Sequence, residues 1–106
     1  MPTFYAEERF WNEYADLSPG DQELFLEARD EFVKSLKAWE SQGCQGIPQF
    51  PKKLGVRSLV RDKKRYMEFA WASDGRCTWE FGTPQRPGKC HVIWRRIGSH
   101  RIYGEP

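Results

Sequence analysis

The chain has 106 residues and a net charge of +2, and its hydrophobic content of 39% includes five Trp, seven Phe and four Tyr. This length predicts a single domain over residues 1–106 with one modest core, and the aromatic content excludes a disordered chain. No apolar run approaches the roughly 18 residues of a membrane span. The N-terminal segment MPTFYAEERF is acidic and lacks an apolar run, so we expect a cytoplasmic protein without a signal peptide.

The charge is unevenly distributed along the chain. Residues 1–50 hold four bases and ten acids, a net charge of −6, whereas residues 51–106 hold thirteen bases and five acids, a net charge of +8. An asymmetry of this size predicts that one face meets a polyanion. The basic half is the better candidate, because the β-strands are expected there too.

The N-terminal half is predicted to be helical after a short first strand at residues 2–5. Apolar side chains recur at helical spacing in residues 6–17 and again in residues 19–39. Ser18, followed by a proline, suits the N-cap of the second helix. Glycines and prolines in residues 41–51 end that helix in a loop.

The C-terminal half alternates with a period of two, which predicts an antiparallel meander. Turns are expected at RDKKR (61–65), at Asp74-Gly75 and at TPQRPGK (83–89). The predicted strands are residues 54–60, 66–73, 76–82 and 90–97. This order predicts an α+β fold in which the helices cover one face of the sheet.

The uncovered face is expected to gather polar side chains that suit an RNA phosphate. Arginines stay charged and can bind phosphate bidentately, while tyrosines can stack on unpaired bases. The register of the last strand leaves open whether Arg95 or Arg96 lies on this face. The candidates for contact with RNA are Lys52, Lys53, Arg57, Tyr66, Arg95 and Arg96.

The same face fits cleavage of RNA without a metal ion. A base takes the proton of a ribose 2′-OH, which attacks the adjacent phosphate, and fixed cations stabilise the charge that develops. His100 or Glu68 can act as base or acid. Simpler interpretations stay open, since Glu68 and Arg76 on neighbouring strands can form a cross-strand ion pair and His100 can be an ordinary surface residue.

The three cysteines predict neither a disulfide framework nor a strong metal site. Cys44, Cys77 and Cys90 are odd in number and form no Cys-x-x-Cys pair. A zinc site of Cys77, Cys90 and His91 can be drawn, but its spacing is unlike that of most zinc sites. We expect small buried thiols, and neither a metal nor another cofactor.

The chain resembles the RelE-type toxins of bacterial toxin–antitoxin systems, within the RelE/ParE superfamily, from about Phe4 to Pro106. The resemblance rests on four patterns in this order: RFWNEYADLSPGDQELFLEARDEFV, YMEFAW, DGRCTWEFG and VIWRRIGSHRIY. It implies a RelE/ParE-like α+β domain, with an N-terminal helical hairpin packed on a small antiparallel four-stranded sheet.

The resemblance also implies an activity. Active members cut messenger RNA in the ribosomal A site and leave a 2′,3′-cyclic phosphate, so we expect an endoribonuclease, or mRNA interferase, that inhibits translation. Arg76 matches the family's strand arginine that binds the scissile phosphate, and His100 matches its C-terminal His or Arg. Tyr103 resembles the late aromatic that stacks on a nucleotide. Glu68 falls where some members carry a catalytic Lys and others a Glu, so either a base or an orienting group is implied there.

The implied partners are a cognate antitoxin, messenger RNA on the ribosome and, through the antitoxin, operator DNA, with no membrane contact. The acidic half is not expected to hold the antitoxin. Two alternatives stay open. One is a ParE-like toxin of the same fold that inhibits DNA gyrase, and the other is a nucleic-acid-binding or repressor module without catalysis.

Overall fold

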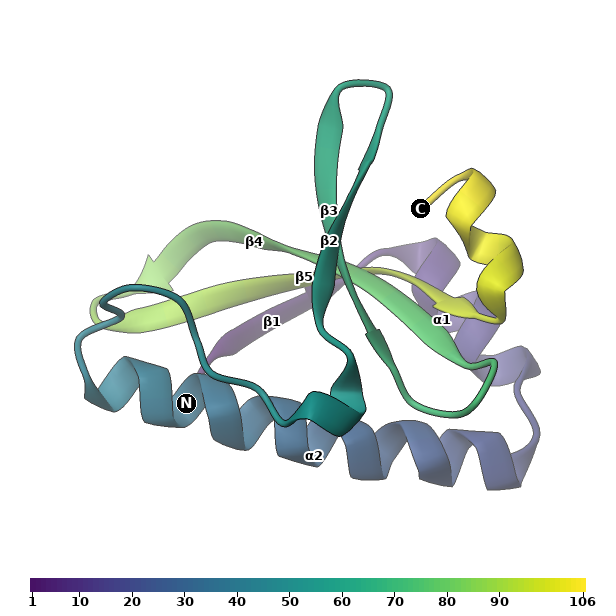
Figure 1. Cartoon of the computed structure of the whole chain (residues 1–106), viewed down its shortest axis with the longest axis horizontal. Coiled ribbons are helices and arrows are strands. Elements are labelled where there is room, and N and C mark those ends of the chain that lie inside the picture. Colours follow the sequence, from purple (N-terminus) through teal and green to yellow (C-terminus); the bar gives the residue numbers. More distant parts are fainter.

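The computed structural model describes residues 1–106, in which α2 covers one face of a five-stranded mixed sheet and α1 packs against strand β5. The strands are β1 (Thr3–Ala6), β2 (Arg57–Arg61), β3 (Lys64–Ala70), β4 (Arg76–Arg86) and β5 (Lys89–Gly98), and the helices are α1 (Glu8–Asp16), α2 (Pro19–Ser41) and the 3-10 helices η1 (Lys52–Leu54) and η2 (His100–Gly104). Figure 1 shows α2 along one face of the sheet and η2 beyond the other. No helix is both long and apolar enough to cross a bilayer.

The α+β class is confirmed, but the expectation of a four-stranded antiparallel sheet is wrong. The order of strands is β1-β5-β4-β3-β2, and β1 lies parallel to β5, with Phe4 opposite Val92. Parallel pairing needs a long connection between the two strands, and the helices and the meander between β1 and β5 provide it. The short first strand is therefore a fifth strand of the sheet.

The second helix begins where the sequence predicts. Ser18 Oγ accepts a hydrogen bond from the backbone N–H of Asp21 at 3.1 Å, and Pro19 occupies the first turn, where no N–H is needed. α2 then continues to Ser41, two residues beyond the predicted end. The first helix is shorter than predicted and spans Glu8–Asp16.

An aromatic core holds α2 on the sheet. Phe32 is 0% exposed, and its ring centroid lies 4.7 Å from that of Trp79 and 5.0 Å from that of Phe69. The ring of Trp94 lies 5.5 Å from the same phenylalanine. Aromatic pairs at such separations contribute beyond the area that they bury, so Phe32 is the point at which α2 is fixed to β3, β4 and β5.

Two glycine turns place the strand boundaries at other residues than the sequence predicts. Leu54 lies in η1 and Gly55 takes a φ of 56°, so β2 begins only at Arg57. Gly88 takes a φ of 72° between β4 and β5, and the segment 83–89 that was expected to be a long turn is mostly strand. Only a residue without a Cβ adopts such angles readily, which is why these turns stay short.

The β3–β4 hairpin ends in a loop at residues 71–75 rather than in a two-residue turn. The backbone N–H of Trp71 donates to the carbonyl of Gly75 at 3.1 Å. A Cβ at Gly75 would lie 2.5 Å from the Trp71 indole, so glycine is required by close approach. The loop thus packs on the indole and presents Asp74, which precedes Gly75, at the end of the hairpin.

A β-bulge in β5 brings two arginines to the open face, by which we mean the face of the sheet opposite α2. Thr78 pairs with Arg96 whereas Trp79 pairs with Trp94, so Arg95 has no partner on β4. The extra residue breaks the alternation of side chains. Arg95 accordingly lies over the Tyr66 ring, 4.7 Å from its centroid. Both Arg95 and Arg96 therefore lie on the open face.

Replacing Phe32 with Ala is expected to lower the free energy of unfolding by about 3–5 kcal/mol, because the ring leaves a cavity among four aromatic neighbours. Urea denaturation followed by circular dichroism measures the change. Val60→Ala, on a half-exposed side chain of the β2–β3 hairpin, is the control and should change stability by under about 0.5 kcal/mol. Equal losses in the two variants would contradict this account of the core.

Candidate functional site

Six polar side chains lie together where η2 packs on β4 and β5, at the open face of the sheet. We call them the polar cluster, and its members are Arg57, Glu68, Asp74, Arg76, His100 and Tyr103. Arg57 lies on β2 and Glu68 on β3, whereas Asp74 lies in the β3–β4 loop and Arg76 at the start of β4. His100 and Tyr103 lie on η2. Segments far apart in the chain thus converge at one point, which Figure 1 places near the C-terminus.

Glu68 is the buried member of the polar cluster. Its side chain lies in the middle of the sheet, opposite Arg57 on β2 and Thr78 on β4, and is only 2% exposed. The Nε of Arg57 donates to its Oε1, whereas its Oε2 is buried without a hydrogen-bond partner. The carboxylate raises the pKa of the Arg57 guanidinium. The alternative that Glu68 and Arg76 form a cross-strand ion pair is therefore wrong, since the partner of Glu68 is Arg57.

Tyr103 covers this carboxylate. Its hydroxyl is buried without a hydrogen-bond partner. Burial of the phenol and, next, the neighbouring Glu68 raise the pKa of Tyr103, so the hydroxyl keeps its proton at neutral pH. The Thr78 hydroxyl is also buried and unpaired. Three polar side chains, Glu68, Thr78 and Tyr103, are therefore buried at this part of the open face.

His100 and Asp74 are exposed members of the polar cluster and contact each other. The Nδ1 of His100 contacts Asp74 Oδ1, and the His100 backbone N–H donates to the same oxygen at 3.5 Å. The hydrogen bond to His100 lowers the pKa of the Asp74 carboxyl. The imidazole also stands edge-on to the Tyr103 ring, with 5.3 Å between centroids. Two neighbours thus fix the ring and leave its Nε2 without a protein partner.

Arg76 is oriented by the hairpin loop. Its Nη1 donates to the carbonyls of Gly75 at 2.8 Å and Ala72 at 3.0 Å. The Nε and Nη2 nitrogens make no hydrogen bond within the protein. A guanidinium that is held at one nitrogen and free at the others is preorganised to bind a phosphate.

The 3-10 helix that carries His100 and Tyr103 is tied down at both ends. Ser99 Oγ accepts from the backbone N–H of Arg101 at 3.3 Å, and Ile102 is buried. The Nε of Arg61 donates to the Tyr103 carbonyl at 3.0 Å. The position of the imidazole is therefore set by backbone contacts as well as by Asp74.

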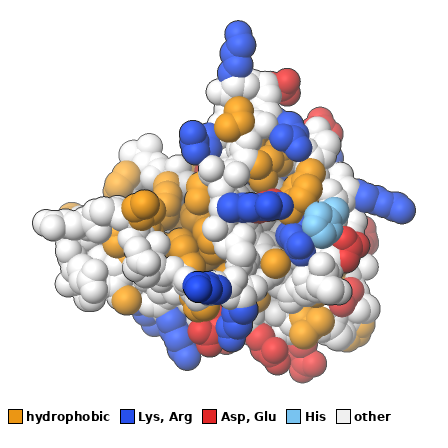
Figure 2. Space-filling view, viewed as in Figure 1, with side chains coloured by type: hydrophobic (Ala, Val, Ile, Leu, Met, Phe, Trp, Pro, Cys, Tyr) orange, Lys and Arg blue, Asp and Glu red, His pale blue; other side chains and the backbone are white.

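The other candidate contacts with RNA are less closely gathered. Lys52 and Lys53 lie on η1, and neither forms a hydrogen bond or ion pair with the polar cluster. Lys53 borders a groove against α2. Figure 2 shows Lys and Arg side chains spread over the projecting β2–β3 hairpin and the centre of the visible face, with a histidine beside them.

The remaining candidates on the open face are engaged within the protein. Tyr66 lies between two cations, with Lys64 Nζ at 5.2 Å and Arg95 Cζ at 4.7 Å from its ring centroid. Arg95 also pairs with Glu7 at 3.1 Å. Arg96 donates to both carboxylate oxygens of Glu13. The structure thus separates Arg57 and Arg76, which keep free guanidinium nitrogens at the polar cluster, from Arg95 and Arg96.

Asp74 is the member that sequence analysis missed, because Asp-Gly between two strands is read first as a turn. The signal that could have found it is the pairing of an acidic loop residue with a histidine just after the last strand. Cys77 and Cys90 are buried, and burial raises the pKa of Cys90 to about 12. No three His, Cys, Asp or Glu side chains are grouped so as to hold a metal ion.

No protein-family profile matches the chain, and no curated protein resembles it in sequence. Among solved structures it is similar to a copper-bound mutant toxin from Helicobacter pylori, with a TM-score of 0.61 at 14% identity over 95% of this chain and 97% of that chain. It is also similar to YafQ from E. coli, with a TM-score of 0.54 at 11% identity over 97% of this chain and 98% of that chain. The chain therefore shares its fold with these two proteins.

The contact between Asp74 and His100 predicts a titration. The folded-state pKa of Asp74 is depressed, so the stabilisation it brings is present above the unfolded-state pKa of about 3.9 and is lost as the pH falls through the folded-state value. Side-chain carboxyl NMR should place the Asp74 midpoint below that of a free Asp, and His100→Gln should raise it. His91→Gln, at the other histidine, is the control. An unchanged midpoint in His100→Gln would contradict the pairing.

Proposed function

We propose that this protein is the toxin of a toxin–antitoxin system and acts as an endoribonuclease that cleaves messenger RNA through attack by a ribose 2′-OH. The observation that carries the proposal is the polar cluster, which joins an Asp-supported imidazole to two arginines with free nitrogens. The fold, shared with a toxin from Helicobacter pylori and with YafQ, supports the toxin role.

In this proposal His100 is the general base. With Nδ1 against the Asp74 carboxylate, the imidazole holds its proton on Nδ1 and offers the Nε2 lone pair to the 2′-OH. Asp74 keeps the ring in this orientation and stabilises the imidazolium that forms. Attack of the 2′-oxygen on the adjacent phosphate forms a 2′,3′-cyclic phosphate as the bond between phosphorus and the 5′-oxygen breaks, and the leaving 5′-oxygen takes a proton from water.

The arginines serve the phosphate. Arg76 has Nε and Nη2 free for a non-bridging oxygen, and its position is fixed by the loop carbonyls. Arg57 is exposed and stays charged beside Glu68. Fixed cations of this kind stabilise the charge of the phosphorane-like transition state without reorganising.

Glu68 acts as a positioning residue rather than as the base. A base must reach the proton that it removes, and a carboxylate that is 2% exposed and bound by Arg57 cannot meet a ribose hydroxyl directly. Its role is to fix Arg57 and to lie beneath Tyr103. The half-buried Tyr103 ring, next to His100, is the proposed stacking surface for a nucleobase.

The ribosome is the proposed place of cleavage, because His100 and Asp74 are exposed at the surface and a ribosome can align the messenger RNA against them. The cations of the β2–β3 hairpin, with Lys52 and Lys53, would contact RNA around the cleavage point. Tyr66, Arg95 and Arg96 would add further contacts with the RNA. A cognate antitoxin is the proposed partner, through which the complex would bind operator DNA.

Primer extension on a reporter messenger RNA, after a short pulse of expression, tests the proposal. We expect cuts with the wild type and a loss of cleavage of about 10²–10⁴-fold with His100→Ala, since that variant lacks the base. Arg76→Ala should also remove the cuts, and Asp74→Asn should reduce them. Arg86→Ala and Gln85→Ala, at the distant end of the β4–β5 hairpin, are the matched controls and should cut like the wild type.

Three other outcomes would reject the proposal. Intact RNA with DNA breaks would indicate a gyrase-directed toxin of the same fold. Intact RNA with normal growth would leave a binding module without catalysis. Cleavage by His100→Ala at the wild-type rate would remove the imidazole from the mechanism even if the nuclease activity were real.

A further inference from the structure

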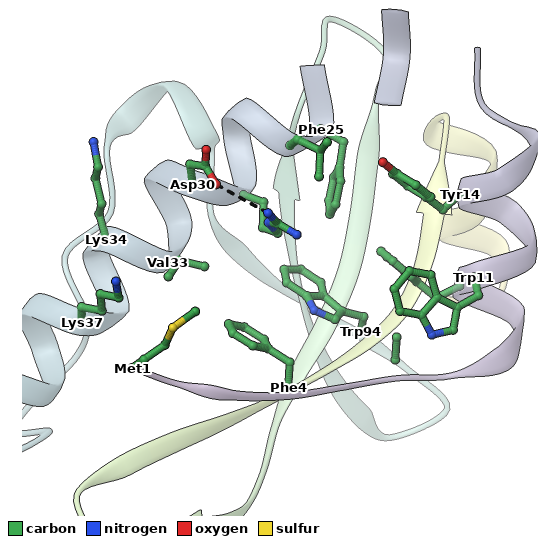
Figure 3. Close-up of a pocket in the computed structure, with 14 residues that line it drawn as sticks. Met1, Phe4, Trp11, Tyr14, Phe25, Asp30, Val33, Lys34, Lys37 and Trp94 are labelled. Atoms are coloured by element: carbon green, nitrogen blue, oxygen red, sulfur yellow. Dashed lines mark ion pairs between the residues drawn. The ribbon is translucent and has the colours of Figure 1, made fainter. Parts of the chain in front are cut away.

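An apolar groove lies on the side of the sheet that faces the helices, bounded by β1, α1 and α2. Its volume is about 640 Å³, and ten of its fourteen lining residues are hydrophobic. Trp94 forms the base of the groove, with Phe4 from β1 and Phe25 from α2 beside it (Figure 3). None of these residues belongs to the polar cluster, so the groove is a separate feature of the molecule.

The groove exposes more aromatic surface than a finished core would. Trp11 is 58% exposed, and Phe4 and Met1 are also exposed at its margin. Monomeric proteins seldom leave several large apolar side chains in one exposed patch unless a partner covers them. Tryptophan is in addition the residue most enriched among the energetic anchors of protein interfaces.

The shape of the groove favours a helix over a compact ligand. Its α2 wall extends from Phe25 to Lys37, which corresponds to about 18 Å at 1.5 Å per residue. This is the length of about three helical turns. Amphipathic helices bind such grooves through apolar side chains on one face, spaced at three and four residues.

The charges at the rim of the groove indicate the sign of the charge that the partner carries. The groove is lined by Arg29, Lys34 and Lys37, three of the four bases in residues 1–50. Arg29 is paired with Asp30 at 3.7 Å, whereas Lys34 and Lys37 form no ion pair. Figure 3 shows the two lysines side by side along the α2 rim. Within an acidic half of the chain, the free positive charge is therefore concentrated at this groove.

The opposite wall does not cancel that charge. Glu7, the N-cap of α1, and Glu13 within α1 bond to Arg95 and Arg96, and neither of the other α1 acids, Glu8 and Asp16, lines the groove. What α1 presents to the groove is Trp11 and Tyr14. The surface is thus an aromatic wall on one side and a lysine rim on the other, which is complementary to a helix with apolar side chains flanked by carboxylates.

We propose that this groove is the docking site for an amphipathic, acidic helix of a partner protein, whose apolar side chains cover Trp11 and Phe4 and whose carboxylates pair with Lys34 and Lys37. The inference does not depend on the nuclease activity, because it concerns other residues on another face. A partner bound here leaves the polar cluster uncovered unless a further segment of the partner reaches it.

The test uses a displayed library of peptides of about 20 residues, long enough to form helices, with Leu at positions i, i+3, i+4 and i+7 and either Glu or Lys at the flanking positions. Selection on the full chain should enrich Glu at the flanks. Fluorescence polarisation of an enriched peptide should then show binding that weakens at least tenfold in Lys34→Glu/Lys37→Glu. Trp11→Gln should weaken it similarly, with thermal melts confirming that both variants fold.

A charge-matched control separates this site from general electrostatics. Lys52→Glu/Lys63→Glu alters the net charge by the same amount at exposed positions outside the groove and should bind the peptide like the wild type. Selection on Lys34→Glu/Lys37→Glu should instead enrich Lys. Three outcomes would each overturn the proposal. The selection could enrich no peptide on the wild type relative to Trp11→Gln, or it could enrich Glu and Lys equally at the flanks. The control pair could also weaken peptide binding as much as Lys34→Glu/Lys37→Glu does.

Discussion

Arg95 and Arg96 hold α1 and the C-terminal segment to β5, and the rest of the molecule depends on this arrangement. Arg96 binds Glu13 and donates to the Glu105 carbonyl at 2.9 Å. Arg95 pairs with Glu7. Because these pairs are partly buried, salt screens them less than it screens surface pairs. One pair of arginines thus places α1, which forms a wall of the groove, and steadies the chain after η2, which carries His100 and Tyr103.

The polar cluster contains both buried and exposed groups, and the two kinds have different roles. The ion pair between buried Glu68 and exposed Arg57 is weak evidence of stabilisation, since taking the Glu68 carboxylate out of water offsets much of the attraction. Its value lies in fixing directions, because a carboxylate at the centre of a sheet can move very little. His100, by contrast, stays open to solvent at one edge, where a proton can be exchanged. Glu68 is therefore the buried charge of the polar cluster, and Arg57, Asp74 and His100 are its exposed groups.

Sequence periodicity was enough to predict the helices, the N-cap at Ser18, the strands of the meander and the polar residues of the open face. It could not predict the bulge, because one extra residue changes the facing of Arg95 without changing the pattern of residue types. It also could not predict that β1 pairs with β5, since a four-residue strand has no partner-specific signal. Asp74 was missed for a similar reason, because its hydrogen bond with His100 joins residues 26 positions apart.

The sum of charges over a segment gives a poor description of the surfaces that the segment builds. Residues 1–50 carry a net charge of −6, yet two of their acids, Glu7 and Glu13, are bound by arginines from the other half. Three of their four bases meanwhile line one groove. The local sign is therefore set by which charges pair internally, and a half that is acidic overall can present a positive rim. Since alternate side chains of a strand point to opposite faces, the same sheet supports this groove on one side and the polar cluster on the other, and substitutions on one face can leave the other intact.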